Sequence, residues 1–209
     1  MNNIHVETSD PNSHHTELYS RMNNKWNLKH NAWTGGHFKV SNLSKGYHGI
    51  LKQYWDFYIK KNNVNVLLVS ESQQVKQEFN LVYPQWEIDT IDLYPEINND
   101  KTQPTIIGDI CSYTNPLSKK YDLIISQATL EHVYNPFQAI YNLSNALNKD
   151  GILVTHTHPP GFEYHRYPCD YIRFMKDWWY DLPKYINNII LMEFYMENNI
   201  NVFTCYKKI

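Results

Sequence analysis

Histidine side chains are the groups of this 209-residue chain that are best suited to acid–base chemistry near neutral pH. Four of them fall in the second half of the chain: His132, His156, His158 and His165. We expect the general base of a reaction to be His132, His156 or His165, and we expect His158 to contact the substrate. The alternative, that these imidazoles only hydrogen-bond to loop carbonyls, stays open from the sequence.

The spacing of His156 and His158 also allows a metal site. Two residues apart on a strand, the two imidazoles point to the same face and could bind zinc together with Asp170 or His165. The Pro159–Pro160 pair ends that strand at once, and no second group of carboxylates lies at metal-ligand spacing. We therefore expect no metal, and we rank a metal-dependent hydrolase as the weakest of the possible functions.

The elements that position these residues lie in the stretch from Tyr121 to Phe174. An apolar strand over 123–126 ends in a polar tip, a helix begins at Asn135 and Pro136 and ends at Asp150-Gly151, and a second strand over 152–156 ends in histidines. In an open α/β sheet, ligands bind outside the carboxyl ends of the strands. The polar side chains expected at this edge are Ser126, Gln127, Glu131, His132, His156 and His158.

Three further strands precede this stretch. They are predicted over 64–69, 86–93 and 105–107, and each is followed by polar residues. Helices are predicted over 50–59, with Ser44 as its N-cap, and over 75–83.

Two β-rich runs at the end of the chain, 189–196 and 200–206, predict a hairpin. Strands that alternate with helices and end in a hairpin indicate an α/β fold, a mostly parallel sheet with an antiparallel edge strand. We expect one domain over residues 43–209 and a preceding segment, 1–42, that is a candidate lid.

Composition excludes several classes of protein. The formal net charge is −2, so we expect no nucleic acid partner, and no apolar run is long enough to span a bilayer. The start of the chain lacks the features of a secretory signal, so we expect a soluble cytoplasmic protein, monomeric or homodimeric. Cys111, Cys169 and Cys205 are too widely spaced for a disulfide framework or a CxxC site.

The order of these elements resembles the class I S-adenosylmethionine-dependent methyltransferases, which have a seven-stranded Rossmann-like fold. The resemblance is strongest in YDLIISQATLEHVYNPFQAIYNLSNALNKDGILVTHTHPP. The segment HRYPCDYIRF is similar to an element of a bacterial methyltransferase subgroup often found among glycan and secondary-metabolite genes.

The resemblance implies that S-adenosylmethionine is the cofactor and S-adenosylhomocysteine the product. Asp92, beside Leu93, would bind the ribose, and Asp109 would meet the adenine amino group with Ile110 beside the ring. Ser126 and Gln127 would face the methionine portion. The first loop would be Ser70, Glu71 and Ser72, which contains no glycine where the family normally has several.

From the resemblance we expect O-methylation of a small hydroxylated acceptor, such as a sugar of a surface glycan or a nucleotide-sugar. The acceptor would be bound by His158, Tyr164, Tyr167 and Arg173. Arg173 has a second interpretation, an ion pair with Asp170 on one turn of helix. The glycine-free loop leaves another alternative open, a binding or scaffold protein that keeps the fold without catalysis.

Overall fold

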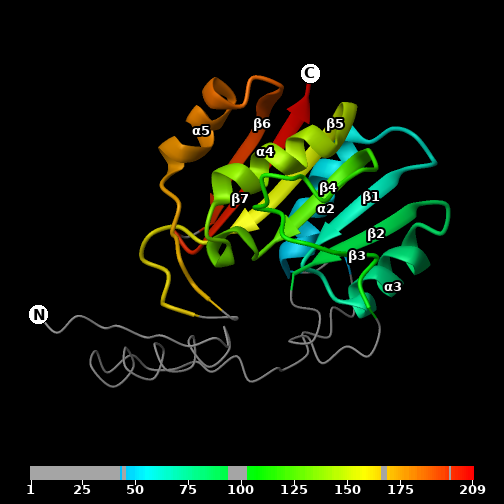
Figure 1. Cartoon of the computed structure of the whole chain (residues 1–209), viewed down its shortest axis with the longest axis horizontal. Coiled ribbons are helices and arrows are strands. Elements are labelled where there is room, and N and C mark those ends of the chain that lie inside the picture. The colour runs from blue at the N-terminus through cyan, green and yellow to red at the C-terminus, as the bar shows by residue number, and fades with distance from the viewer. Residues whose placement is uncertain (1–42, 44–45, 94–102, 166–168, 198) are drawn as a thin grey trace, which may run out of the picture.

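The computed structural model describes residues 43, 46–93, 103–165, 169–197 and 199–209. Its centre is a seven-stranded sheet in the order β3-β2-β1-β4-β5-β7-β6 (Figure 1). The strands are β1 (Asn65–Val69), β2 (Glu87–Asp92), β3 (Ile106–Ile107), β4 (Tyr121–Gln127), β5 (Leu147–Thr157), β6 (Ile189–Glu197) and β7 (Asn201–Lys208). The predicted mostly parallel sheet with a C-terminal hairpin is confirmed.

The antiparallel strand lies inside the sheet, and the prediction that it forms the edge is wrong. Strand β7 pairs with β5 on one side and β6 on the other, both antiparallel, so β6 is the edge strand. Burial explains the order. Residues Asn201–Tyr206 of β7 are all buried, which requires a strand on each side. Most residues of β6 are half-buried or exposed, so this strand can form the edge of the sheet.

The chain changes direction across the sheet between β1 and β4. Strands β2 and β3 extend it to one side of β1, and β4 then pairs with the opposite side of β1. This is a topological switch point, where the carboxyl ends of two neighbouring strands leave room for a ligand. Val69 of β1 is paired with Ser126 of β4, and Gln127 with His156 of β5, so the three strand tips meet at one edge.

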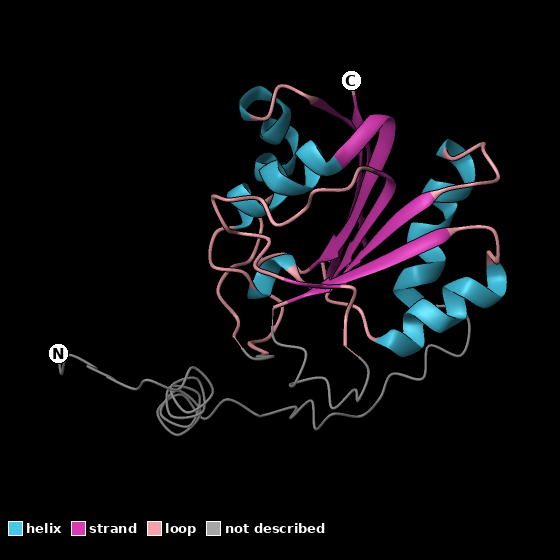
Figure 2. Ribbon diagram, turned by 45° about the vertical axis from the view of Figure 1, so that its right-hand side comes forward, coloured by secondary structure: helices cyan, strands magenta, loops and turns pink. Residues whose placement is uncertain are grey.

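Helices pack on both faces of the sheet (Figure 2). One face carries α2 (Gly46–Tyr58) and α3 (Gln73–Val82), and the other carries α4 (Pro136–Ala146) and α5 (Lys176–Tyr185). Strand β1 serves both cores: Leu68 packs on the side of Trp55, and Leu67 on the side of Trp179, each fully buried. None of the described helices is long and apolar enough to cross a membrane.

Helix α4 begins as predicted and ends early. The Asn135 side chain accepts a hydrogen bond from the backbone N–H of Gln138 at 3.1 Å, and Pro136 follows as the first helical residue. The helix ends at Ala146 rather than at Asp150-Gly151. Leu147 is already extended and pairs with Tyr121, so four residues predicted as helix belong to β5. The predicted Ser44 cap and the 1–42 segment lie outside the described residues.

A buried carboxylate joins three strands at the edge opposite the strand tips. Asp122 of β4 accepts hydrogen bonds from the backbone N–H of Asn65 in β1 at 2.9 Å and from the side chain of Asn148 in β5 at 2.7 Å. Lys61 lies 2.5 Å away. Burial alone would raise the pKa of this carboxyl, but the hydrogen bonds outweigh burial and hold the pKa below its ordinary value.

Replacing Asp122 with alanine is expected to lower the free energy of unfolding by about 2–4 kcal/mol at pH 7, because buried donors lose their partner. Since the folded pKa is depressed, this stability is present above the unfolded value of about 3.9 and disappears as pH falls through the folded value. Urea unfolding between pH 7 and about pH 2 measures both effects. Asp181→Ala, which removes an exposed pair with Lys184, is the control and should change nothing.

Candidate functional site

The tip of β4 presents two buried polar atoms without partners. Ser126 Oγ and Gln127 Oε1 have no hydrogen bond within the described part of the chain. Such atoms cost stability unless a ligand or water pairs with them. Ala128 follows with φ 45°, an unusual conformation for a residue with a side chain, and its N–H donates to His156 O at 2.9 Å. These two atoms, which we call the orphan atoms, therefore lie at the end of β4, where the backbone turns sharply and is held by a hydrogen bond to β5.

The loop that follows β1 contains a residue in the left-handed backbone conformation, and this residue is not a glycine. Ser70 has φ 55°, and its N–H donates to Ile91 O at 2.8 Å. Glu71 is paired with His48 of α2, whose Nε2 lies 3.0 Å from the carboxylate, and Ser72 caps α3 by accepting from the N–H of Val75. Serine thus takes the backbone conformation that glycine usually supplies, while Glu71 and Ser72 have structural partners.

Ser70→Gly should leave the free energy of unfolding nearly unchanged, because glycine adopts a positive φ without steric cost but loses more entropy on folding. Ser70→Val should cost about 1–2 kcal/mol, because a β-branched side chain fits the left-handed region poorly. Thermal unfolding of both variants measures the difference. Equal stability of the two would show that the left-handed conformation of this loop is wrong.

The predicted adenosyl contacts lie at the ends of β2 and β3. Asp92 ends β2 half-buried, and Leu93 is exposed beside it. Asp109 is exposed, and its Oδ1 accepts from the N–H of Cys111 at 2.7 Å, which is the geometry of a turn. Ile110 is buried. The positions suit the predicted roles, and the roles themselves stay predictions.

A buried carboxylate beyond the β4 tip is surrounded by imidazoles. Glu131, in the 3-10 helix η2 (Leu130–His132), has no exposed surface. Its Oε1 lies 3.6 Å from His158 Nε2, 3.8 Å from His132 Nε2 and 3.8 Å from His165 Nε2. Its Oε2 accepts from Thr157 Oγ1 at 2.6 Å. We call these four residues, Glu131, His132, His158 and His165, the Glu131 cluster.

Burial sets the electrostatics of the Glu131 cluster. It raises the pKa of the Glu131 carboxyl above its ordinary range, although His158 and Thr157 act in the opposite direction. It lowers the pKa of His132, His158 and His165 below the ordinary imidazole value. All four groups are thus held toward their neutral forms. His165, with a quarter of its side chain exposed, is the member that solvent reaches most easily.

His156 lies beside this cluster, with its ring centroid 5.1 Å from that of His158, and has partners of its own. Its ring stacks on Tyr47 at 4.0 Å between centroids, and its Nε2 lies 3.1 Å from Asn201 Oδ1. Burial lowers the pKa of His156 to about 3, so the ring is neutral at neutral pH and a weak base. Among the three predicted bases, the geometry brings His132 and His165 to Glu131.

The segment after β5 is held by an ion pair. Arg173 pairs with Asp170 as predicted, but residues 169–175 form no helix. Arg173 Nη2 also donates to Glu163 O at 2.9 Å, and Asp170 accepts from the N–H of His165 at 2.7 Å. These bonds fix the loop that carries His165. Tyr164 is half-buried in the same loop, and Tyr167 lies outside the described residues.

The sequence did not single out Glu131 as the centre of the site. The sequence places it at the polar strand edge together with five other polar side chains. The sequence feature that could have indicated its importance is a glutamate that directly precedes His132 and follows an apolar strand. Its surroundings, which make it chemically unusual, include His158 from the end of β5 and His165 from the later loop.

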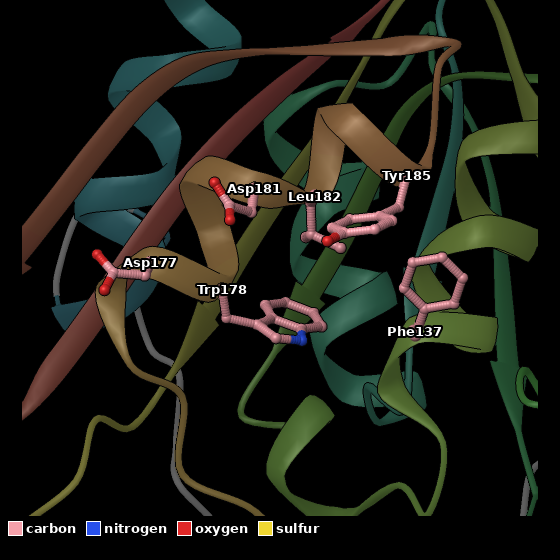
Figure 3. A pocket seen from close by; sticks show the side chains of 6 residues that line it. All are labelled: Phe137, Asp177, Trp178, Asp181, Leu182 and Tyr185. Atoms are coloured by element: carbon pink, nitrogen blue, oxygen red, sulfur yellow. The ribbon is translucent and has the colours of Figure 1, made fainter.

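A groove lies apart from the strand tips, between α4 and α5. It has a volume of about 460 Å³, and aromatic rings from both helices face each other across it (Figure 3). The groove contains none of the predicted site residues. Its lining is Phe137, Asp177, Trp178, Asp181, Leu182 and Tyr185.

Comparison with solved structures identifies the fold. The plantazolicin methyltransferase BpumL, in complex with S-adenosylhomocysteine, matches 96% of this chain and 91% of its own with a TM-score of 0.59 and 16% identity. A methyltransferase from Archaeoglobus fulgidus matches 77% of this chain and 92% of its own, with a TM-score of 0.56 and 12% identity. The fold is that of the class I methyltransferases.

The same fold carries more than one kind of reaction. The [4+2]-cyclase SpnF matches 77% of this chain and 80% of its own, with a TM-score of 0.56 and 11% identity. No family model matches the sequence, and no curated protein matches it. At these identities the likeness establishes the fold, and the reaction must be argued from the site.

Proposed function

We propose that this protein is an S-adenosylmethionine-dependent methyltransferase that acts on a hydroxyl group of a small acceptor. The observation that carries the proposal is the pair of orphan atoms, Ser126 Oγ and Gln127 Oε1, at the switch point of a methyltransferase fold. These two atoms and the left-handed Ser70 loop lie where the strand tips of β1 and β4 meet. Buried hydrogen-bonding capacity at that place fits a polar ligand.

The cofactor would be held along the tips of β1 to β4. We assign the ribose hydroxyls to Asp92, because a carboxylate can accept two hydrogen bonds from a vicinal diol. The adenine would lie near Asp109 and Ile110, and the methionine portion near Ser126 and Gln127. When bound, S-adenosylmethionine supplies a methyl group on a sulfonium centre whose leaving group is neutral.

The acceptor would lie against the Glu131 cluster. A hydroxyl must lose its proton as it is methylated, and the cluster offers neutral imidazoles that can accept it, with the Glu131 carboxyl group beside them. Phe162, stacked on His158, and Tyr164 add aromatic rings to the same loop. Aromatic faces pack well on the apolar faces of sugars, so we propose a saccharide or nucleotide-sugar as the acceptor.

Calorimetry with S-adenosylhomocysteine tests cofactor binding. We expect the wild-type protein to bind it and Asp92→Ala to bind about 10- to 100-fold more weakly, since a hydrogen bond to a charged group contributes roughly 1.5–3 kcal/mol. Glu87→Ala is the matched control, because Glu87 lies on the same strand at the opposite end and is exposed. Folded wild-type protein that gives no heat would overturn the proposal.

Glu131→Gln tests the acceptor side. The amide keeps the shape of the side chain and its contact with Thr157 but cannot exchange a proton with the imidazoles, so methyl transfer should slow by about 100-fold or more. The affinity for S-adenosylhomocysteine should stay within a factor of about two, because the cluster is assigned to the acceptor. Transfer of labelled methyl groups to a panel of sugars and nucleotide-sugars measures the first effect. An unchanged rate would contradict the assignment.

A second candidate is a protein that binds the cofactor or another ligand without catalysis. The pairing of Glu71 with His48 favours it, because the acidic group of the first loop is already engaged by α2. The same labelled-methyl assay separates the two candidates. Transfer to any acceptor rejects the second, whereas cofactor binding without any transfer over a broad acceptor panel favours it.

A further inference from the structure

We propose that Glu131, His158 and His165 form a binding site for a divalent first-row transition-metal ion. Each residue offers one ligand atom, and these atoms lie within 4.8 Å of one another. The three residues come from η2, the end of β5 and the loop that Arg173 holds, so the fold brings them together from separate elements. This inference concerns metal binding and does not depend on the methyltransferase proposal.

The distances suit a common ion. Two ligands that are each about 2.1 Å from a tetrahedral ion lie about 3.4 Å apart. Glu131 Oε1 lies 3.6 Å from His158 Nε2 and 3.8 Å from His165 Nε2, a few tenths of an ångström wider. Side-chain movements would have to close that difference and also bring the two imidazole nitrogens, which lie within 4.8 Å of each other, to the same spacing. His132 Nε2 also lies 3.8 Å from Oε1, so a third imidazole adjoins the three proposed ligands.

The hydrogen bonds on the far side of two rings direct lone pairs at Glu131. His158 Nδ1 lies 2.9 Å from Ile200 O, and His132 Nδ1 bonds to Cys169 O. A carbonyl oxygen can only accept, so each Nδ1 carries the proton and each Nε2 presents its lone pair to Glu131 Oε1. Metal-binding histidines are held in this way, with the other ring nitrogen donating to a carbonyl or carboxylate.

His165 is held by a carboxylate in place of a carbonyl. Its Nδ1 has Asp170 Oδ2 at 3.6 Å and Arg173 Nη2 at 3.3 Å. Arginine can only donate, so Nδ1 accepts from Arg173 here and the ring proton lies on Nε2. Binding an ion through Nε2 requires the other tautomer, with the Nδ1 proton directed at Asp170. Asp170 is itself fixed by Arg173, so its orientation is set before any ion arrives.

The carboxylate provides the second, independent observation. Glu131 Oε1 is fully buried and has no hydrogen-bond donor among the residues that the structure describes, while Oε2 accepts from Thr157. The lone pairs of His132 Nε2 and His158 Nε2 converge on this oxygen, and they repel it in its ionised form. A cation at their centre removes this repulsion and pairs with the buried oxygen.

The ligand types select the ion. Two imidazoles and one carboxylate suit zinc and the neighbouring divalent transition ions better than magnesium or calcium, which prefer all-oxygen sites. Three protein ligands also leave a position for water or a substrate oxygen. We therefore choose zinc and cobalt as probes.

The test uses the full chain purified without a histidine tag and stripped with a chelator. Other histidines of the chain, such as His14 and His15, can also bind zinc, so the readout is the difference between variants. Zinc titration calorimetry should detect a site in the wild type that Glu131→Gln weakens by at least about 100-fold, beyond the roughly 10- to 100-fold loss caused by removing an outer partner. Bound cobalt should give a visible spectrum that the variant lacks.

Two further variants keep the test decisive. His165→Gln, the most exposed member, should lose the same site and the same cobalt spectrum even if Glu131→Gln unfolds. Glu163→Gln is the matched control, a glutamate on the same loop outside the cluster, and should bind as the wild type does. Equal zinc affinity and identical cobalt spectra in the wild type and in His165→Gln would overturn the proposal.

Discussion

The candidate site depends on one buried carboxylate. Glu131 has no exposed surface, accepts a hydrogen bond from Thr157 through its side chain, and accepts backbone bonds from Tyr171 and Ile172 through its carbonyl. The last two bonds tie η2 to the segment before α5. A carboxylate in such a place is unstable without compensation, so the loops and imidazoles around it must be held in position.

The sheet holds the strand ends that carry these loops and imidazoles in place. The switch between β1 and β4 opens the edge where the strand tips meet, and the two apolar cores on either face make β1, β4 and β5 rigid. Ser126 and Gln127 end one strand and His156 the next, in direct register. In the described part of the segment after β5, the Asp170–Arg173 ion pair holds the chain in position.

Apolar runs predicted most of the sheet, because buried parallel strands are nearly continuous in Val, Ile and Leu. The end of α4 was missed because Leu147–Asp150 contains no residue that forbids a helix, and only pairing with Tyr121 makes it a strand. The polar residues at the strand tips were also predictable from the sequence. The Glu131 cluster was not, because contacts among η2, the end of β5 and the later loop depend on tertiary packing. His156 is equally buried, and its contacts with Tyr47 and Asn201 distinguish it from the imidazoles around Glu131.

The central claim is that the switch point binds S-adenosylmethionine through the tips of β1, β2 and β4. A crystal structure with S-adenosylhomocysteine bound tests it most directly. The account predicts ribose hydroxyls at Asp92 and ligand atoms bonded to Ser126 Oγ or Gln127 Oε1, with the sulfur turned toward the Glu131 cluster. Ligand elsewhere on the protein, or strand tips that stay without ligand at saturating concentration, would contradict the account.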